Sequence, residues 1–556
     1  MRTTRLDFAK EVLAQLKEHI QVEISLETPP ELALGDYALP CFTLAKDFKK
    51  SPQAIAQELA EKITPAPPIA RVVAQGPYLN IFLDKAVVAE RVLTAAPDRI
   101  ETGKKVLFEY PSPNTNKPFH LGHLRNMLLG QATSNIVEQA GNTVVRTNLN
   151  NDRGVHICKS MLAYDIYGEN KTPQDLGLKP DHFVGHWYVR FAQEAEKNPE
   201  LEVQAQELLR KWEAGDAHAQ ALWKKMNDWA YEGFKETFLR LGVTFDKQYY
   251  ESGFYEQAKE TVKQAHEKGI FSTDDKGNIV AELGKLGTKV VLRADGTAVY
   301  ATQDVGLGTI RQVEFAPDEQ VYVVAEEQNY YFEQLFAIFD LLGFTHTRHH
   351  LSYGLISLPS GRMKSREGTV VDCDELLNEM EELAAAEIKK RHPDISEEEL
   401  AKRSIAIGHG ALRFFILKYE PKTAFVYNPE ESMSFEGETG PYVQYAAARI
   451  ASILRELPAP LTADYGVLVA DEEYALITAL RNTQDVIQEA AQHYKPHLVA
   501  RHAMKIAQDF TTFYHEHHIK TAETSVRDAR LILIKTTREH LTLLLGLLGI
   551  TTLEEM

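Results

Sequence analysis

The hydrophobic and polar positions of the first hundred residues predict a small mixed unit of helices and strands. An amphipathic pattern opens the chain, and a second helix is expected over 51–63, because Ser51 can cap its first turn and Pro52 suits its first position. After a proline-rich break, the β-branched, alternating segment 70–83 predicts two paired strands around a turn at Gly76–Pro77. This part of the chain is therefore expected to form an α+β domain.

The pattern then changes to that of a parallel sheet. An apolar run over 105–110 predicts a strand, a helical pattern from Leu121 to Ala140 follows a loop rich in Pro and Asn, and 143–146 predicts the next strand. A strand, a helix and a second strand in this order form the unit from which Rossmann-type parallel sheets are built. We therefore expect such a sheet to begin near residue 101.

The rest of the chain predicts an insertion, a return to the sheet and a helical region. Residues 152–269 are mostly helical and polar in pattern, which predicts an insertion between two halves of the sheet. Strand signals return at 290–292, 321–324 and 355–358, where we expect the sheet to resume. From about Leu376 to the end the pattern predicts helices with long apolar faces. The fold class expected is therefore multidomain α/β, with an all-α C-terminal part.

Composition narrows the class of protein. The 556 residues exceed what one hydrophobic core supports, and at roughly 150 residues per domain they predict three or four domains. No stretch approaches the ~20 consecutive apolar residues that span a bilayer, and the opening segment lacks the apolar core of a secretory signal. We therefore expect a cytoplasmic protein that does not associate with membranes.

Cysteine spacing and charge exclude further classes. Cys41, Cys158 and Cys373 are far apart, which excludes a disulfide framework and a C-x-x-C zinc site, so no structural zinc is expected. The formal net charge of −18 argues against general affinity for nucleic acid, because such binding needs Lys and Arg to displace counterions. Residues 1–100 and 481–556 are nearly balanced in charge, so these two ends are where a polyanion is best tolerated.

The segment 113–123, Pro-Asn-Thr-Asn-Lys-Pro-Phe-His-Leu-Gly-His, is the most informative for chemistry because it joins a predicted strand to a predicted helix. Ligands of parallel sheets bind at such edges, and a triphosphate there would meet the positive end and free N–H groups of the helix near Leu121. His120 and His123 can donate hydrogen bonds to phosphate oxygens as charge develops, and Gly122 lets a flat base approach the backbone. The alternative is that the two histidines are helix caps or surface residues.

A second candidate is the glycine-bounded basic loop 361–368, which follows the strand predicted at 355–358. Its cations Arg362, Lys364 and Arg366 suit the clamping of a leaving pyrophosphate, whose negative charge must be stabilised in the transition state. The alternative for this segment is a solvated surface turn.

Together these segments resemble the arginyl-tRNA synthetases, a family of class I aminoacyl-tRNA synthetases. Segment 113–123 is similar to the family's HIGH signature with its upstream context, and 362–366 occupies the place of the KMSKS loop. Segments 34–38 and 76–80 resemble the family's N-terminal domain, and 439–449 resembles the start of its helical C-terminal domain. The resemblance covers nearly the whole chain.

The resemblance implies a function and a division of labour among domains. Arginine would be activated by ATP, which carries Mg²⁺, and the arginyl group would pass to the terminal adenosine of arginine-specific tRNA, without a dedicated metal site in the protein. A tRNA-contacting domain is expected at 1–100, and a Rossmann-type catalytic domain at 101–375 with the insertion at about 152–269. The helical region 376–556 would connect to an anticodon-binding domain at about 435–556. We expect a monomer, since no long heptad run is present.

The predicted arginine pocket follows from motif context within this resemblance. A guanidinium offers five donors in a planar fork, so it needs carboxylates, other acceptors and a flat face. Glu109 and Asn114 would hold the α-amino and carboxylate ends of arginine. Tyr300 and Asp304 would stack on and pair with the guanidinium, and Gln328 would complete the set. Alternatively, the acids cap loops, the tyrosine belongs to the core and the glutamine starts a surface helix.

The resemblance also assigns the remaining site residues. ATP binding is expected of Phe119, His120, Gly122, His123 and Met363, and catalysis of Lys117, His120, His123, Arg362 and Lys364. Because Arg362 and Ser365 stand where a full KMSKS loop has lysines, Lys117 is the expected substitute cation, unless it is simply exposed to solvent. Tyr442 and Tyr445 are the expected tRNA-binding residues, with packing in the core as the alternative.

Three other functions remain open on the sequence. Another class I synthetase would share the fold, although the cysteine enzyme's zinc-ligand cysteines are missing and a glutamate pocket would need a cation where Tyr300 and Asp304 stand. A nucleotidyltransferase that makes a small acyl-adenylate would not need the C-terminal helices. A catalytically silent tRNA-binding paralogue is expected to lose the nucleotide motif, yet Lys117, His120 and His123 are present.

Overall fold

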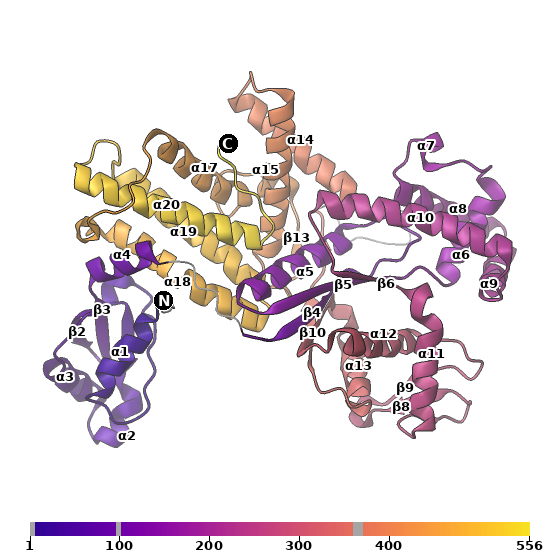
Figure 1. Ribbon diagram of the computed structural model, residues 1–556, viewed down its shortest axis with the longest axis horizontal. Coiled ribbons are helices and arrows are strands. Elements are labelled where there is room, and N and C mark those ends of the chain that lie inside the picture. Colours follow the sequence, from indigo (N-terminus) through magenta and orange to yellow (C-terminus); the bar gives the residue numbers. More distant parts are fainter. Residues whose placement is uncertain (1–5, 96–101, 360–370) are drawn as a thin grey trace.

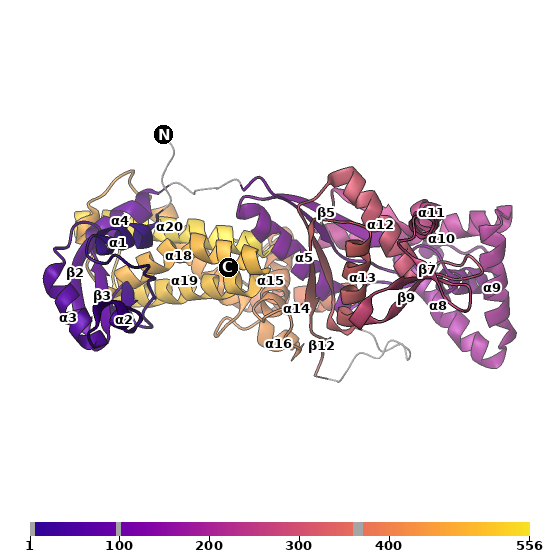
Figure 2. The same cartoon turned by 90° about the horizontal axis from the view of Figure 1, so that it is seen from below.

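The computed structural model describes residues 6–95, 102–359 and 371–556. Figure 1 shows an elongated arrangement in which the N-terminal domain lies at one end, C-terminal helices lie next to it, and a β-sheet with further helices continues towards the other end. The perpendicular view in Figure 2 shows the same order along the long axis. Among the residues described, no helix is long and apolar enough to cross a membrane.

The N-terminal domain is an α+β unit, as the sequence predicts. Its elements are α1 (Phe8–Lys17), β1 (Tyr37–Pro40), α2 (Ala45–Phe48), α3 (Pro52–Lys62), β2 (Ile69–Gln75), β3 (Tyr78–Leu83) and α4 (Lys85–Thr94). The predicted cap is confirmed, because the Ser51 hydroxyl accepts a hydrogen bond from the backbone N–H of Ala54 at 3.3 Å. The predicted strand pair is confirmed too, since β2 and β3 pair antiparallel across the Gly76–Pro77 turn and β1 pairs with β3.

A five-stranded parallel sheet forms the centre of the molecule. Its strands are β4 (Lys105–Glu109), β5 (Thr143–Asn150), β6 (Lys247–Tyr250), β10 (Glu319–Ala325) and β11 (Thr347–Tyr353), and they lie in the order β11-β10-β4-β5-β6. After β4 the chain adds β5 and β6 on one side of β4, and it later adds β10 and β11 on the other side. Ligands of such sheets bind beyond the carboxyl ends of the strands at this reversal point, here beyond β4 and β10.

The helix that follows β4 confirms the predicted unit. α5 (Leu121–Gln139) joins β4 to β5 and is buried along most of its length. It starts beyond the loop rich in Pro and Asn and ends just before Gly141, which has a φ of +100° that suits a residue without a side chain. The segment 113–123 therefore lies at the carboxyl edge of the sheet, beside the reversal point.

Three predictions about the sheet are wrong in detail. The predicted insertion contains β6, which pairs with β5 as an edge strand of the central sheet. The signal at 290–292 is part of β9 (Thr288–Leu292), which belongs to a separate antiparallel sheet with β7 (Ser272–Thr273) and β8 (Ile279–Glu282). The signal at 355–358 gives only β12 (Ile356–Ser357), which pairs with β13 (Phe425–Val426). Of the three later strand signals, only the one at 321–324 joins the central sheet.

The helices between β5 and the antiparallel sheet form the far end of the molecule, at the right of Figure 1. They are α6 (Val155–Tyr167), α7 (Pro173–Leu176), α8 (Pro180–Lys197), α9 (Glu200–Glu213), α10 (Ala217–Arg240) and α11 (Glu251–Glu267). Four of them, α6, α8, α9 and α10, pack around a core of their own that holds Trp187 and is lined by the other three tryptophans. Two further helices, α12 (Tyr300–Phe315) and α13 (Asn329–Leu341), lie beside β10 in sequence and pack on each other.

The C-terminal region is almost entirely helical, as predicted. Its helices are α14 (Cys373–Arg391), α15 (Glu397–Leu417), α16 (Pro429–Ser432), α17 (Gly440–Glu456), α18 (Asp471–His493), α19 (Pro496–Glu516) and α20 (Thr524–Leu547). α15, α18, α19 and α20 contact α5, so the helical region packs directly against the helix that begins with the predicted nucleotide motif. The multidomain α/β fold class is therefore confirmed.

Candidate active site

Two neutral imidazoles form the N-terminus of α5. His120 is the N-cap residue, and its Nδ1 accepts a hydrogen bond from the backbone N–H of Gly122 at 3.1 Å. The backbone N–H of His120 in turn donates to Nδ1 of His123 at 3.2 Å, and the two rings lie 3.8 Å apart between centroids. Because Nδ1 accepts in both rings, the proton of each neutral imidazole is on Nε2. The two histidines therefore cap the start of α5, as in the alternative stated above. This capping uses only Nδ1, so the Nε2–H group of each ring remains as a donor.

Burial keeps these imidazoles uncharged. It lowers the pKa of His120 to about 4, an effect that the nearby Lys117 ammonium strengthens and Asp372 opposes. Burial, His120 and Lys117 together hold the pKa of His123 well below its usual range. Both histidines are therefore neutral hydrogen-bond donors at neutral pH, and neither is a cation before a ligand binds.

The backbone N–H groups at the start of α5 are not free, which corrects the expectation that they meet a phosphate directly. His120 N–H and Gly122 N–H are bound by the two imidazoles, and Leu121 N–H donates to the Val371 carbonyl at 3.0 Å. The donors available at this helix end are therefore the Nε2–H groups, together with the positive potential of the helix terminus.

Lys117 supplies the positive charge of this region. It is half-buried in the loop before α5, and burial lowers the pKa of its ammonium group. The loop is held from two sides: Thr115 N–H donates to the Asn151 carbonyl at 3.2 Å, and Pro118 packs so closely on Gly185 of α8 that a Cβ there would come within 2.7 Å of it. The ammonium forms no ion pair with any residue that the structure describes. Within the described ranges, the ammonium group near the two imidazoles therefore has no anionic partner.

The segment after the basic loop runs beside the histidines. Val371 accepts from the N–H of Leu121, and Cys373 N–H donates to the Phe119 carbonyl at 3.0 Å. Phe119 itself is fully buried and packs its ring on that of Phe234 at 4.5 Å. Arg362, Met363 and Lys364, which were predicted to clamp pyrophosphate and bind ATP, lie outside the described residues, as does the rest of 360–370.

A half-buried carboxyl group with a raised pKa lies on α12. Asp304, on the second turn of α12, accepts a hydrogen bond from the Tyr331 hydroxyl. Burial raises the pKa of Asp304 to about 7, which the tyrosine hydrogen bond opposes and the nearby Glu109 carboxylate reinforces. Tyr300 lies one helical turn before Asp304 on α12 and is 80% exposed, so it is not a core residue. An open aromatic ring and a desolvated acid are thus presented by one helix face.

Glu109 ends β4 and already has a cation as partner. Its carboxylate accepts from the guanidinium of Arg311, which is 1% exposed, and from the Ser112 hydroxyl at 3.2 Å. Arg311 also brings two buried donors, Nε and Nη2, that have no partner among the described residues. Nothing in the sequence indicated this ion pair, because the two residues are 202 positions apart. Glu109 is therefore fixed in place at the edge of the sheet.

The other two predicted pocket residues lie at exposed positions on the same edge. Asn114 is exposed and forms a bridge with Asn151. Gln328 ends the short helix η4 (Glu326–Gln328) after β10 and lies exposed at the start of α13. This position matches the alternative in which the glutamine starts a surface helix.

A second buried acid, Glu251, was missed by the sequence analysis. It is the first residue of α11, directly after β6, and is 8% exposed. Burial raises its pKa to about 7, while the Gln303 amide that donates to it and the Arg153 guanidinium at 3.7 Å oppose the shift. Gln303, whose amide donates to Glu251, directly precedes Asp304 on α12, and the Asp304 carboxylate helps to raise the pKa of Glu251. An acid directly after a strand is a usable signal, but the sequence pattern around β6 predicts part of a helical insertion instead of a strand.

The two predicted tRNA-binding tyrosines have different environments. The Tyr442 hydroxyl donates to Thr511 Oγ1 at 3.1 Å and joins α17 to α19, so this residue serves helix packing. Tyr445 is 36% exposed, and its hydroxyl accepts a hydrogen bond from Arg449 at 2.6 Å. The guanidinium of Arg449 also lies 5.0 Å from the ring centre of Tyr514. An aromatic and cationic surface of this kind suits stacking on bases.

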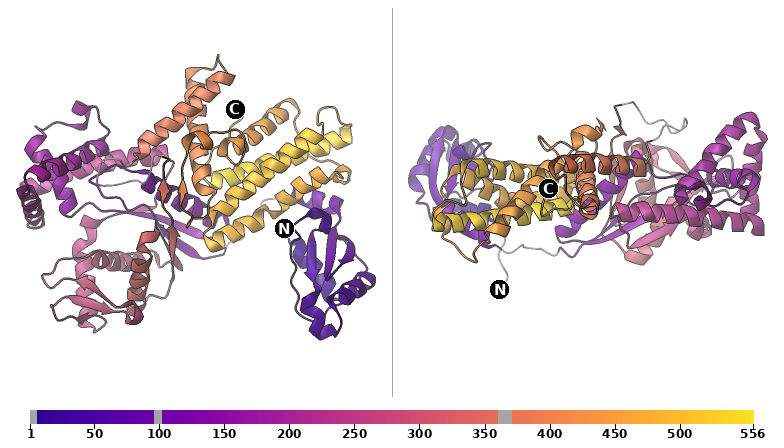
Figure 3. Two further views of the ribbon diagram at one scale, coloured as in Figure 1. Left: turned by 180° about the vertical axis from the view of Figure 1, so that it is seen from behind. Right: turned by 90° about the horizontal axis from the view of Figure 1, so that it is seen from above.

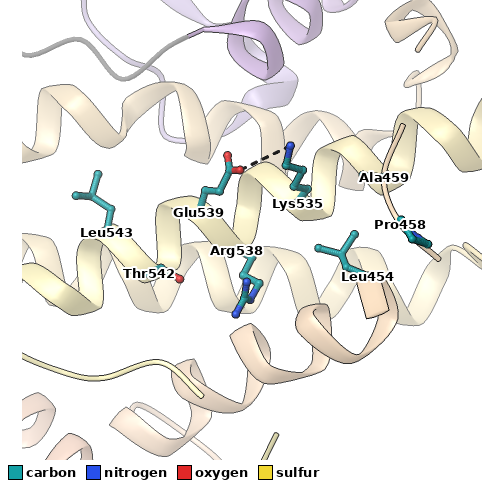
Figure 4. A pocket seen from close by; sticks show the side chains of 8 residues that line it. All are labelled: Leu454, Pro458, Ala459, Lys535, Arg538, Glu539, Thr542 and Leu543. Atoms are coloured by element: carbon teal, nitrogen blue, oxygen red, sulfur yellow. Dashed lines mark ion pairs between the residues drawn. The ribbon is translucent and has the colours of Figure 1, made fainter. Parts of the chain in front are cut away.

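Two depressions elsewhere contain none of the predicted site residues. One is a groove of about 640 Å³ between the end of α17, the segment after it and α20. The side chains that line it are labelled in Figure 4: Leu454, Pro458, Ala459, Lys535, Arg538, Glu539, Thr542 and Leu543. A second depression, of about 410 Å³, adjoins Asp181, His182 and Asp374, whose ligand-type atoms lie within 4.8 Å of one another. Lys179 pairs with both acids, at 3.2 and 2.8 Å, so this cluster already holds a cation of its own.

Comparison with known proteins gives a consistent result over the whole length. Three family models match: the arginyl-tRNA synthetase N-terminal domain at residues 7–83, the catalytic domain of class I tRNA synthetases for arginine at 85–428, and the DALR anticodon binding domain at 443–556. The arginine–tRNA ligase of Treponema pallidum is 40% identical over 96% of this chain and 95% of its own, and that of Bacteroides thetaiotaomicron is 39% identical over 93% of each.

A solved structure agrees with these relatives. The arginyl-tRNA synthetase of Thermus thermophilus superposes with a TM-score of 0.85 at 27% identity, covering 99% of this chain and 100% of that one. Domain content, full-length similarity and fold lead to one conclusion: this chain belongs to the arginyl-tRNA synthetase family.

Proposed function

We propose that the chain activates L-arginine with ATP to form arginyl-adenylate and pyrophosphate, and then transfers the arginyl group to the 3′-terminal adenosine of arginine-specific tRNA. The observation that carries this proposal is the pair of desolvated acids, Asp304 and Glu251, at the same sheet edge as the imidazole pair of α5. The two acids suit a guanidinium, and the two imidazoles suit phosphate oxygens.

The nucleotide binds at the start of α5 in this proposal. Lys117 supplies a cation beside the Nε2–H donors of His120 and His123. These groups would bind the phosphates of ATP, with Gly122 and Phe119 beneath the nucleoside. Mg²⁺ enters as the complex with ATP and supplies charge neutralisation on the phosphates. Arg362, Lys364 and Met363 are proposed to contact the nucleotide from the basic loop.

The amino acid lies between β4, α11 and α12 in this proposal. The guanidinium would pair with the Asp304 and Glu251 carboxylates and stack on Tyr300, while Asn114, Glu109 and Gln328 border its α-amino and carboxylate end. Arginine is always cationic in the relevant pH range, so it favours the ionised form of both acids. An uncharged or anionic amino acid would leave the Asp304 carboxylate without a cationic partner, which disfavours it strongly.

The reaction itself needs no covalent enzyme intermediate. The arginine carboxylate would attack the α-phosphate in line, with the chain's residues holding both reactants in position and stabilising negative charge on the transferred group. The 3′ end of the tRNA then accepts the arginyl group from the adenylate. The anticodon of the same tRNA is proposed to bind α17–α20, where Tyr445 would contact it. The N-terminal domain would contact the outer corner of the tRNA. We propose that the protein works as a monomer in the cytoplasm.

Replacing His120 by Asn tests the proposed imidazole donors. Asparagine is a good N-cap, so α5 should keep its start and the free energy of unfolding should change by less than about 1 kcal/mol. The Nε2–H donor is lost, so the rate of adenylate formation should fall roughly 10- to 100-fold, the worth of one hydrogen bond to a charged group. The measurement is single-turnover activation followed by rapid quench.

The matched comparison for this variant is His120→Ala, which removes the cap as well. It should show the same loss of rate plus about 1 kcal/mol less stability. A His120→Asn enzyme with the normal rate would show that the imidazole only caps the helix.

A charging assay tests the function as a whole. Purified protein is offered each of the twenty amino acids with total tRNA and ATP, and acid-precipitable aminoacyl-tRNA is counted. We expect arginine alone to be esterified, and only to arginine-specific tRNA. Esterification of another amino acid would replace the proposed specificity, and pyrophosphate exchange without any charging would favour an acyl-adenylate-forming enzyme.

A further inference from the structure

A buried acid of the N-terminal domain is bound by the C-terminal helices. Asp36 is 3% exposed, and its Oδ1 accepts from the Tyr474 hydroxyl at 2.7 Å and from Arg481 Nη1 at 2.9 Å, both on α18. Its Oδ2 accepts from the backbone N–H of Leu83 in its own domain at 2.9 Å. The carboxylate is therefore shared between two domains, and the Arg481 side chain that reaches it is itself only 5% exposed.

The backbone around this acid is fixed closely. Gly35 has a φ of +114°, and a Cβ there would come within 2.8 Å of the Ile81 carbonyl of β3. The same carbonyl accepts the N–H of Asp36 at 2.8 Å, so the acid is seated on the sheet. The guanidinium of Arg481 lies 5.6 Å from the ring centre of Tyr37, which places the cation within the surface of the N-terminal domain. The predicted family segment 34–38 is thus a docking segment.

A second contact at this boundary is of a weaker kind. Lys85, the first residue of α4, pairs with Asp471 at 2.9 Å and donates to the Val469 carbonyl at 3.2 Å. Asp471 is 95% exposed, so water and salt screen this pair. The buried group of Asp36, Tyr474 and Arg481 is therefore the contact that can define the position of one domain relative to the other.

The two domains meet at one side of the molecule. Figure 1 and the rear view in Figure 3 both place the N-terminal domain beside α18, at the far end of the C-terminal helices from the central sheet. α4 contacts α18, α20 and the short helix η5 (Tyr465–Val467), so the helix that ends the N-terminal domain also lies on the helical region.

From this geometry we infer that the Asp36–Arg481 pair is a positioning device for tRNA binding. It holds the N-terminal domain at one distance and angle from the anticodon-binding helices, so that both can contact one tRNA at once. This inference rests on the proposed function, in which these two domains contact the corner and the anticodon of the tRNA. A pre-positioned second contact raises affinity because its ordering cost is met before binding.

The test uses Asp36→Asn in the full-length protein, with two RNAs. One is the full-length arginine-specific tRNA, and the other is its isolated anticodon stem-loop, which is too small to reach both domains. Asparagine keeps the size of the side chain and loses the charge that Arg481 needs. We expect about tenfold or greater loss of affinity for the full-length tRNA, less than twofold change for the stem-loop, and a raised KM for tRNA with little change in kcat.

Two further variants define the role. Tyr474→Phe removes one hydrogen bond without leaving a buried charge unpaired, so it should show a smaller loss in the same direction for full-length tRNA. Lys85→Met removes the exposed pair at the same boundary and should change neither affinity by more than about twofold.

Each result separates the inference from the function on which it rests. If the unmodified protein binds the full-length tRNA no more tightly than the stem-loop, the N-terminal domain does not contact tRNA and that part of the proposed function fails. If it binds the full-length tRNA more tightly and Asp36→Asn keeps the whole difference, the positioning role is overturned. An equal loss for both RNAs overturns it as well, since damage to the helical region would then explain the effect.

Discussion

Replacing Asp304 with asparagine is expected to weaken arginine binding by about 30- to 1,000-fold at pH 8, which corresponds to 2 to 4 kcal/mol. The asparagine would keep the volume of the side chain and the hydrogen bond from Tyr331, so the pocket should keep its shape. What is lost is the negative charge opposite a desolvated guanidinium. Binding of arginine and of ATP is measured separately by calorimetry, and the affinity for ATP should change less than twofold.

The same chemical change at an exposed site is the control. Asp228→Asn removes a carboxylate that is 55% exposed on α10 and pairs with Lys224, so it should leave arginine binding unchanged. An unaltered affinity for arginine in the Asp304 variant would place this acid outside the pocket and leave Glu251 as the acid that reads the substrate.

Replacing Lys117 with alanine is expected to lower the rate of adenylate formation by roughly 10²-fold or more, about 3 kcal/mol of transition-state stabilisation. The reason is that its half-buried ammonium has no ion partner in the described part of the chain and lies beside the two imidazoles of α5. Arginine affinity should barely change, because the proposed arginine pocket is formed by other elements. Single-turnover activation with saturating substrates measures the effect.

Two variants sharpen this second result. Lys117→Arg keeps the charge and should recover most of the rate, and Lys263→Ala, at an exposed position on α11, should have no effect. Near-normal activation by the Lys117→Ala enzyme would mean that the cations of the basic loop alone stabilise the transition state. Lys117 would then not substitute for the lysines that Arg362 and Ser365 replace in that loop.

The elements that sequence patterns predicted well are those whose burial is decided locally. β4, α5 and β5 were expected because β4 has an apolar centre, Val106–Phe108, and α5 is long and bounded by a loop and a glycine. β6 and β11 were not expected, because an edge strand needs only a few buried positions and both contain many polar residues. Their membership of the sheet is decided by pairing with distant strands, and no local pattern contains that information.

The same limit explains where strand signals were read correctly but assigned to the wrong sheet. β9 has the apolar content of a buried strand, yet it pairs antiparallel with β8 because a short connection brings the two together. β12 is too short for the central sheet and instead pairs with β13, which follows in the chain only after α14 and α15.

For the site, spacing within one element was informative and contact between elements was not. Tyr300 and Asp304 are four residues apart, so a helix had to place them on one face. The pairing of Glu109 with Arg311 and the proximity of Glu251 to Asp304 depend on strand order, so they appear only in the structure. Capping of α5 by its own imidazoles was the local alternative that the sequence offered, whereas the hydrogen bond from Leu121 N–H to the Val371 carbonyl joins distant segments and appears only in the structure.

The central claim is that the half-buried carboxyl group of Asp304, whose pKa is raised, recognises the arginine side chain. Proton release on arginine binding tests this claim most directly. Asp304 has a pKa of about 7 in the free protein, so it is mostly protonated at pH 6 and mostly ionised at pH 8. Because the guanidinium requires the carboxylate, binding must release the proton at the lower pH, and affinity must fall as pH drops below 7.

Calorimetry of arginine binding in buffers of different ionisation enthalpy counts these protons. We expect the unmodified protein to release about one proton more at pH 6 than Asp304→Asn does, and both to release almost none at pH 8. A Glu251→Gln variant separates the contribution of the second acid. Equal proton release by the unmodified protein and Asp304→Asn at pH 6 would contradict the account, because the carboxyl group would then not change its ionisation when arginine binds.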